Sequence, residues 1–362
     1  MMTAGRCQAT RTRLSEGRRA GVEVLKVDNG TLRLSLLPQR GMGIWKVVLG
    51  DQEFGWRSPV FGPVHPMFVP VHDPSGLGWL EGFDELLCRC GLQSNGPPVF
   101  DATGRLAYPL HGRVANLPAE GIEIRHDEVT GQLDVIGVVH EARFLQFNLR
   151  MTSTLTMRPG EPAFTIRDEV ANLSPSPTHC QLLYHYNIGL PVLGEGAEVV
   201  APIRELAPRD ACAAMGVSDW SRIGPPQLGF AEQVFYSELN SRPDGTTQVL
   251  LKSPDEKTGA GIRFNVSQLP CFVLWKNSTD ARDGYVVGIE PSTNFPNPRP
   301  FEIEQGRMVT LQSGGSTCFD LRFEFYADRK QVSAVEGEVE ALREVSEPKV
   351  FPQPRSGWSP GA

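Results

Sequence analysis

The sequence lacks any apolar run long enough to span a bilayer. Its N-terminus is basic, but it also lacks the apolar stretch that a secretory signal needs. We therefore expect a soluble, cytoplasmic protein with no membrane partner.

Basic residues are also fewer than acidic ones. Lys and Arg together number 35 against 42 Asp and Glu, which gives a formal net charge of −7 at pH 7. Nucleic-acid binding depends on an excess of basic side chains, so this balance excludes it as an expected function. A polar, neutral small molecule fits the charge better.

Cysteine occurs seven times but never as a Cys-x-x-Cys pair. We therefore predict no structural metal and no cofactor, and expect a reduced chain. Cys88 and Cys90 are two residues apart, so they would face the same side of a strand, most simply in a core.

Helical periodicity is scarce, whereas 37 glycines and 30 prolines interrupt the chain at short intervals. This punctuation favours many short strands. Asp-Asn-Gly at 28–30, between two alternating runs, predicts a hairpin. Only residues 329–345 have apolar residues at helical spacing. The expected strands are 21–27, 31–37, 132–140, 146–157, 162–171, 181–187, 246–252, 260–266, 271–276, 284–290, 307–312 and 318–327.

The organisation along the chain follows from these patterns. We expect a flexible N-terminus over 1–20, one continuous all-β domain over 21–346, and a disordered, proline-rich tail over 347–362. Residues 51–110 are rich in Gly, Pro and Trp without clear periodicity, which predicts loop excursions forming one wall of a binding cleft.

Three side chains form the most coherent catalytic set: His111 in Pro-Leu-His-Gly-Arg, His185 in Leu-Leu-Tyr-His-Tyr-Asn, and Glu290 in Gly-Ile-Glu-Pro-Ser-Thr-Asn. A carboxylate and an imidazole can move a proton between two oxygens near neutral pH. The alternatives are histidines that are satisfied within the core and a strand-terminal glutamate in solvent.

These motifs resemble, in the same order, those of the aldose 1-epimerases (galactose mutarotases). The likeness spans roughly residues 25–328. Arg40-Gly-Met-Gly, Trp56-Arg-Ser-Pro, Cys90-Gly-Leu and Leu110-His-Gly-Arg look like an under-characterised branch of aldose-1-epimerase-like proteins.

The resemblance implies a β-supersandwich of stacked antiparallel sheets with a short C-terminal helix. It also implies that Glu290 is the general base, that His185 is the general acid and that His111 is a second donor. A mutarotase of this kind needs no cofactor, and its partner is a small-molecule sugar.

The sequence differs from the family at the positions that bind the hydroxyl groups of the sugar. The Asp-His-like motif is absent, with Asp84 and Asp280 as the substitutes, and Arg40 stands in for the missing Asn-Arg pair. Pro291-Ser-Thr-Asn294 replaces the family's glutamine. We expect Arg40, Arg113, Asn187, Asn294 and Asp84 to bind a sugar other than galactose or glucose.

Other functions remain open at this stage. One is a carbohydrate-binding or sensing protein on the same fold. Another is a lyase or isomerase for an acidic or modified sugar, which Arg40 and Arg113 would suit. A metal site built from His111, His185 and a carboxylate is a further alternative. We expect a monomer or a homodimer.

Overall fold

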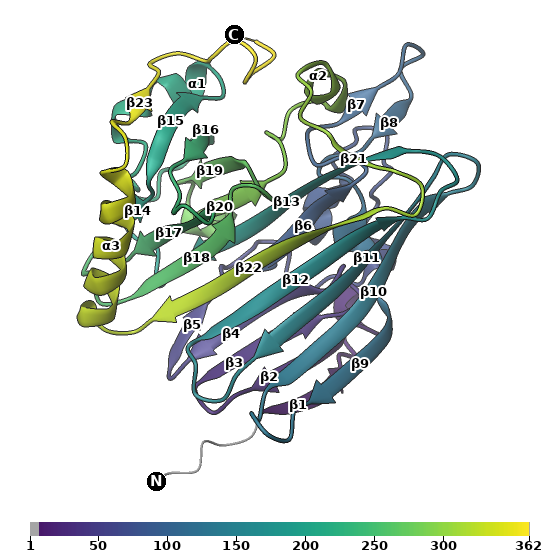
Figure 1. Ribbon diagram of the computed structural model, residues 1–362, viewed down its shortest axis with the longest axis horizontal. Coiled ribbons are helices and arrows are strands. Elements are labelled where there is room, and N and C mark those ends of the chain that lie inside the picture. Colours follow the sequence, from purple (N-terminus) through teal and green to yellow (C-terminus); the bar gives the residue numbers. More distant parts are fainter. Residues whose placement is uncertain (1–6, 362) are drawn as a thin grey trace.

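Two layered β-sheets dominate the computed structural model, which describes residues 7–361 (Figure 1). The expected all-β fold is confirmed. Within the described residues the larger sheet has thirteen strands and the smaller has eight. Neighbouring strands are antiparallel except for one short parallel pair, β15 with β23.

The larger sheet runs in the order β1 (Gln8–Arg13), β2 (Glu23–Asp28), β3 (Leu32–Leu37), β4 (Gly43–Leu49), β6 (Leu87–Leu92), β13 (Thr178–Gly189), β20 (Val286–Ser292), β19 (Cys271–Asn277), β16 (Gln233–Leu239), β15 (Ile203–Pro208) and β23 (Lys349–Val350), with β5 (Gln52–Phe54) beside β4 and β21 (Val309–Leu311) beside β13. The smaller sheet runs β14 (Glu198–Val200), β17 (Thr246–Lys252), β18 (Gly259–Asn265), β22 (Ser316–Tyr326), β12 (Ala163–Asn172), β11 (Phe147–Met157), β10 (Leu133–Arg143) and β9 (Glu120–His126). A separate hairpin joins β7 (Val99–Phe100) to β8 (Leu106–Tyr108).

Helices are short and lie at the edges. The α-helices are α1 (Ala211–Ala214), α2 (Arg299–Glu304) and α3 (Arg329–Arg343), and the 3-10 turns are η1 (Gly17–Arg19), η2 (Pro66–Phe68), η3 (Gly78–Gly82), η4 (Val114–Asn116), η5 (Val217–Asp219) and η6 (Ala281–Asp283). The side chain of Asp328 caps α3 by accepting a hydrogen bond from the amide of Gln331. Val332, Val335 and Val339 of α3 pack against the outer side of β17.

Alternating hydrophobic residues build the core between the sheets. Along β10 and β11 every second side chain is buried, and the two strands pair over their full length as the sequence predicts. The predicted hairpin at 28–30 is confirmed, since β2 pairs with β3 across it. A second apolar cluster covers the opposite face of the larger sheet and includes Trp79, Tyr236 and Trp358.

Both predicted flexible ends need correction. Residues 8–13 form β1 and pair with β2, so the expectation for the N-terminus is wrong there, and residues 1–6 lie outside the described residues. The C-terminal tail is ordered too: β23 pairs with β15, and Trp358 is buried. Proline-rich composition predicts disorder only where no large apolar side chain anchors the segment.

The loop-rich stretch 51–110 conceals a central strand. Every residue of β6 is buried, so the strand shows no in-out alternation and escapes a periodicity search. Its neighbours in the sheet are β4 and β13. The excursions around it cross the face of the larger sheet opposite the smaller one, and η3 contributes Trp79 to the cluster on that face.

Candidate active site

His185 and Glu290 lie side by side on adjacent strands of the larger sheet. The pairs Leu183–Ser292 and Tyr186–Ile289 fix the register of β13 and β20, and this register places His185 opposite Glu290. On the far side of Glu290, β19 contributes Val273. Because side chains of directly paired residues share a face, these residues form one row across the sheet.

The imidazole of His185 and the carboxyl group of Glu290 are close enough to exchange a proton. Nε2 of His185 lies 3.2 Å from Oε1 of Glu290, although the two atoms are not aligned as a hydrogen bond. Gly288, two residues before the glutamate, leaves room for the carboxyl group. A Cβ at this glycine would lie 2.2 Å from Oε1 of Glu290.

Asn187 fixes the tautomer of His185. The amide nitrogen of Asn187 donates to the carbonyls of Glu85 and His185, so its Oδ1 is the atom that faces Nδ1 of the imidazole. An amide oxygen only accepts, so Nδ1 of His185 carries a proton. In the neutral ring Nε2 is then unprotonated, and it is this atom that faces Glu290.

His111 reaches the same place from a tight loop. Its backbone has φ of +55°, a conformation that few non-glycine residues adopt. The amide of His111 donates to Gly96, and its carbonyl accepts from Gly91 at the end of β6. Nδ1 lies 2.9 Å from the carbonyl oxygen of Asn95, and the ring centroid is 5.5 Å from that of His185.

Burial and neighbouring charges shift the pKa values of Glu290 and His185 in opposite directions. Burial raises the pKa of Glu290 well above its usual range, and the neighbouring Cys90 adds to the shift. Burial, with repulsion from His111, lowers the pKa of His185 to about 3. Burial therefore favours the protonated carboxyl group of Glu290 and the neutral imidazole of His185.

Cys90 changes the state of His111. Burial alone lowers the pKa of this imidazole, but the charge of and hydrogen bond with Cys90 outweigh it and raise the pKa to about 9. Burial raises the pKa of the Cys90 thiol, yet the hydrogen bond from Cys88 and the charge of His111 bring it down to about 6. His111 is thus a proton donor at neutral pH.

All three groups line a cavity of about 800 Å³. The structure thus brings the three predicted side chains together around one cavity. Aromatic rings surround His185: the centroid of Phe83 lies 5.1 Å away, that of Trp275 5.3 Å and that of Trp79 6.1 Å. Aromatic faces pack well against the C–H groups of a sugar ring, and the cavity volume falls in the range of small-molecule sites.

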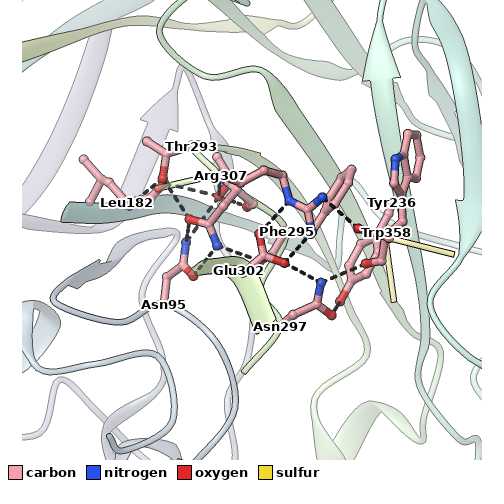
Figure 2. A network of polar contacts seen from close by, with 12 residues as sticks. Asn95, Leu182, Tyr236, Thr293, Phe295, Asn297, Glu302, Arg307 and Trp358 are labelled. Carbon is pink, nitrogen blue, oxygen red and sulfur yellow. Dashed lines mark hydrogen bonds and ion pairs between the residues drawn. The ribbon is translucent and has the colours of Figure 1, made fainter. Parts of the chain in front are cut away.

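The C-terminal segment closes one side of the cavity, where residues 353, 354, 360 and 361 contribute to the lining. A polar network holds this segment in place (Figure 2). Nδ2 of Asn297 donates to the carbonyl of Trp358 and to Glu302, and Oδ1 of Asn297 accepts from Tyr236. Arg307 donates to both carboxylate oxygens of the buried Glu302 and to the carbonyl of Gly357.

The two arginines predicted to hold substrate lie elsewhere. Arg40 is buried beside the carboxylate of Glu85, with Nε 2.7 Å from Oε1, and does not line the cavity. Arg113 pairs with the buried Glu141 and borders a different depression. Both guanidinium groups are committed to carboxylates of the chain itself, so their assignment to substrate needs correction.

The other predicted binding residues support the site rather than line it. Asn187 orients His185, as described above. Asn294 is fully buried and exchanges two hydrogen bonds with Asn95. Asp84 is buried beside Glu85, and Asp280 pairs with Arg282 on η6; neither borders the cavity.

Several residues that line the cavity were not predicted from the sequence. Arg209, Asp210 and Glu232 stand together at its edge. Val234 and Tyr236 follow on β16, at the period-2 spacing that should have placed them on one face. The Arg-Asp pair between two strands was the signal available for the first group.

Within residues 7–361, no group of three or more His, Cys, Asp or Glu side chains is arranged to hold a metal ion. In that same part of the chain, no helix has the length and hydropathy needed to cross a membrane.

The fold and this site define a class, the galactose-mutarotase-like β-supersandwich. A solved structure from Klebsiella pneumoniae, provisionally assigned as an aldose 1-epimerase, is similar over 95% of this chain and 89% of its own, with 33% identity and a TM-score of 0.90. A galactose mutarotase-like protein from Clostridium acetobutylicum has a TM-score of 0.60 at 12% identity, covering 89% of this chain and 99% of its own. Galactose 1-epimerase from Lactobacillus acidophilus has a TM-score of 0.58 at 12% identity, with the same coverage. The last two likenesses show the fold alone.

Residues 19–325 match the family described as Domain of unknown function (DUF4432), and the chain belongs to this family. No match was found among curated protein sequences.

Proposed function

We propose that the protein is an aldose 1-epimerase-like isomerase that interconverts the anomers of a sugar by acid–base ring opening. The observation that carries this proposal is the contact of 3.2 Å between Nε2 of His185 and Oε1 of Glu290 on the wall of an aromatic cavity. The Klebsiella protein with its 33% identity, provisionally assigned as an aldose 1-epimerase, supports it.

The pair holds one proton between its two members. Transfer of that proton from the carboxyl group of Glu290 to Nε2 of His185 produces a carboxylate base and an imidazolium acid without any exchange with solvent. His111, whose pKa is raised to about 9, is a second donor beside them. The chemistry therefore needs only side chains that are already present.

Ring opening consumes and returns this proton in one cycle. Glu290 takes the proton of the anomeric hydroxyl, the bond between the anomeric carbon and the ring oxygen breaks, and its electron pair goes to the ring oxygen. An imidazolium protonates that oxygen while the anomeric carbon becomes a carbonyl. Rotation about the adjacent carbon–carbon bond, followed by the reverse steps, closes the other anomer, so acid and base exchange roles.

Anomer exchange measured by NMR in a panel of neutral aldoses tests the proposal. The wild-type protein should exchange at least one sugar faster than buffer alone. Glu290→Gln and His185→Ala should each lower kcat by about 10²–10⁴-fold, the usual contribution of one proton transfer. His179→Ala is the matched control, because this histidine lies on the same strand but is exposed, away from the cavity.

Two outcomes would count against the assignment. Exchange at the buffer rate for every sugar in the panel, with no binding, would remove its basis. Binding of a sugar without exchange would instead support the carbohydrate-binding or sensing function.

A further inference from the structure

At the edge of the cavity, negatively charged side chains outnumber positively charged ones. Arg209, which directly precedes the N-cap residue of α1, donates from Nε to Oδ2 of Asp210 at 2.8 Å and from Nη2 to Oε1 of Glu232 at 2.9 Å. One guanidinium group thus faces two carboxylates. Two of the five N–H donors of Arg209 are engaged by these carboxylates, and the two negative charges outweigh the single positive charge of the guanidinium group.

The remaining cavity residues do not reverse this balance. Among the cavity-lining residues within 7–361, Arg209 is the single Lys or Arg side chain. The positive charge of His111 is matched by the thiolate of Cys90 next to it. Burial disfavours a negative charge on Glu290, so this carboxyl group supplies no positive charge to offset the two carboxylates.

Glu232 is fixed in this position by a second contact. Its Oε2 accepts a hydrogen bond of 2.7 Å from Nε1 of Trp275, one of the rings around His185. The carboxylate is therefore held beside the aromatic ring of Trp275 in the cavity lining, and the Glu232 side chain is about half exposed. An incoming anionic group would meet a negative charge that cannot swing away without breaking two hydrogen bonds.

We propose that this site accepts neutral sugars and rejects sugars that carry a carboxylate, and that Glu232 is the specificity-determining residue. The proposal rests on the function proposed above and deepens it. It also disfavours the lyase or isomerase for an acidic sugar, because the two arginines that suggested it are paired within the protein.

Matched sugar pairs test the selection, because they differ only in a hydroxymethyl or a carboxylate group: galactose with galacturonate, glucose with glucuronate, mannose with mannuronate. For the pair with the most active neutral member, wild-type kcat/KM should be at least about tenfold higher for the neutral sugar at low salt. Raising the ionic strength should narrow this ratio, because the edge of the cavity is partly exposed.

Glu232→Gln removes the charge while keeping an oxygen for Trp275. This variant should raise kcat/KM for the uronate and lower the ratio of kcat/KM for the neutral sugar to kcat/KM for the uronate by about tenfold. Asp210 is a poorer target, because its side chain also caps α1. Glu238→Gln is the control: this residue lies on the same strand, β16, but pairs with Arg204 outside the cavity.

Binding measured by calorimetry separates this proposal from the one it rests on. Tighter wild-type binding of a neutral sugar than of its uronate, reduced in Glu232→Gln, supports charge selection even when no anomer exchange occurs. Equal or tighter binding of the uronate, an unchanged preference in Glu232→Gln, or no binding of any sugar in the pairs overturns it.

Discussion

Glu290 and His185 owe their protonation states to the strands that carry them. Each lies on a central strand of the larger sheet, under the loops that hold Trp79 and Phe83. In this setting a lone carboxylate or imidazolium group loses its hydration, so both groups favour their neutral forms. In the proposed function, this preference lets the two side chains share one proton as an acid–base pair.

The stability of the protein should report the raised pKa of Glu290. The folded state retains a proton that the unfolded chain releases above the usual carboxyl range, so folding becomes less favourable as pH rises toward the raised pKa. Glu290→Gln has no such titration. Its free energy of unfolding, relative to wild type, should therefore increase with pH by up to about 1.4 kcal/mol per pH unit.

Urea denaturation between pH 6.5 and 9 measures this difference. His185 has the opposite linkage, since its lowered pKa costs stability only as pH falls below its ordinary value of 6.5. The chosen range avoids that titration. Glu304→Gln, at an exposed position of α2, is the control. Parallel curves for Glu290→Gln and wild type would show that the carboxyl group ionises as freely in the folded protein as in the unfolded one.

The sequence located the candidate catalytic residues on one cavity more successfully than the candidate binding residues. His111, His185 and Glu290 stand in short motifs whose order along the chain resembles a known family, and the structure brings all three to one cavity. Arg40 and Arg113 were assigned to substrate because an arginine in a polar stretch looks the same whether its partner is a ligand or a carboxylate of the chain. Glu85 and Glu141 are those partners, and only the folded chain brings them close.

At the scale of elements, the strands with clear alternation were predictable and those buried on both faces were not. The observed ends of β10, β11 and β12 lie close to the expected ones. β6 was hidden because all six of its residues are buried, including Arg89. Edge strands such as β1 were also missed, since an exposed strand of polar residues has no apolar period to detect.

The C-terminal segment is the element whose role departs most from its composition. The ring centroid of Trp358 lies 4.8 Å from that of Phe295, which follows the strand that carries Glu290. The contacts of Asn297 and Arg307 also hold this segment (Figure 2). Its residues 353, 354, 360 and 361 form a wall of the cavity. A wall of this kind excludes water from the reacting groups and adds contact area for the substrate.

Removing the segment should therefore weaken binding more than folding. A chain ending at Pro348 should retain its β-sheet circular dichroism but show KM raised by about tenfold or more, because one side of the cavity is open. Trp358→Ala should produce a smaller effect in the same direction and make the segment sensitive to limited proteolysis.

Lys349→Ala is the control for this experiment. Its side chain is exposed and lies 3.9 Å from Glu205, while the backbone pairing of β23 does not depend on it. An unchanged KM in the truncated protein would show that the segment packs against the cavity without contributing to it.

For the whole molecule, a buried ion pair joins the two sheets. Arg89 of β6 binds the carboxylate of Asp168 on β12 through two nitrogens, with Nη2 3.0 Å from Oδ1. Tyr184 of β13 donates to the same carboxylate at 2.8 Å, and Ser153 of β11 accepts from Arg89 at 2.8 Å. The charges are almost fully buried, so each depends on the other for compensation.

Breaking this pair should destabilise the fold without touching the cavity. Asp168→Asn leaves a buried guanidinium group without its counter-charge and should lower the free energy of unfolding by about 3–5 kcal/mol. The neighbouring exposed pair of Arg167 and Asp320 provides the comparison. Asp320→Asn should cost no more than about 1 kcal/mol, the usual range for a surface ion pair.

Chemical denaturation of both variants measures the two losses in the free energy of unfolding. An apolar double replacement, Arg89→Met with Asp168→Leu, tests whether the ion pair stabilises the fold more than apolar side chains would. The double variant should recover part of the loss, because no uncompensated charge remains, but not all of it, because Tyr184 and Ser153 lose their partners. Equal costs for Asp168→Asn and Asp320→Asn would mean that water reaches the interface between the sheets. In that case the low dielectric that supports the pKa shifts on the opposite face of the larger sheet would have to come from the loops and the C-terminal segment alone.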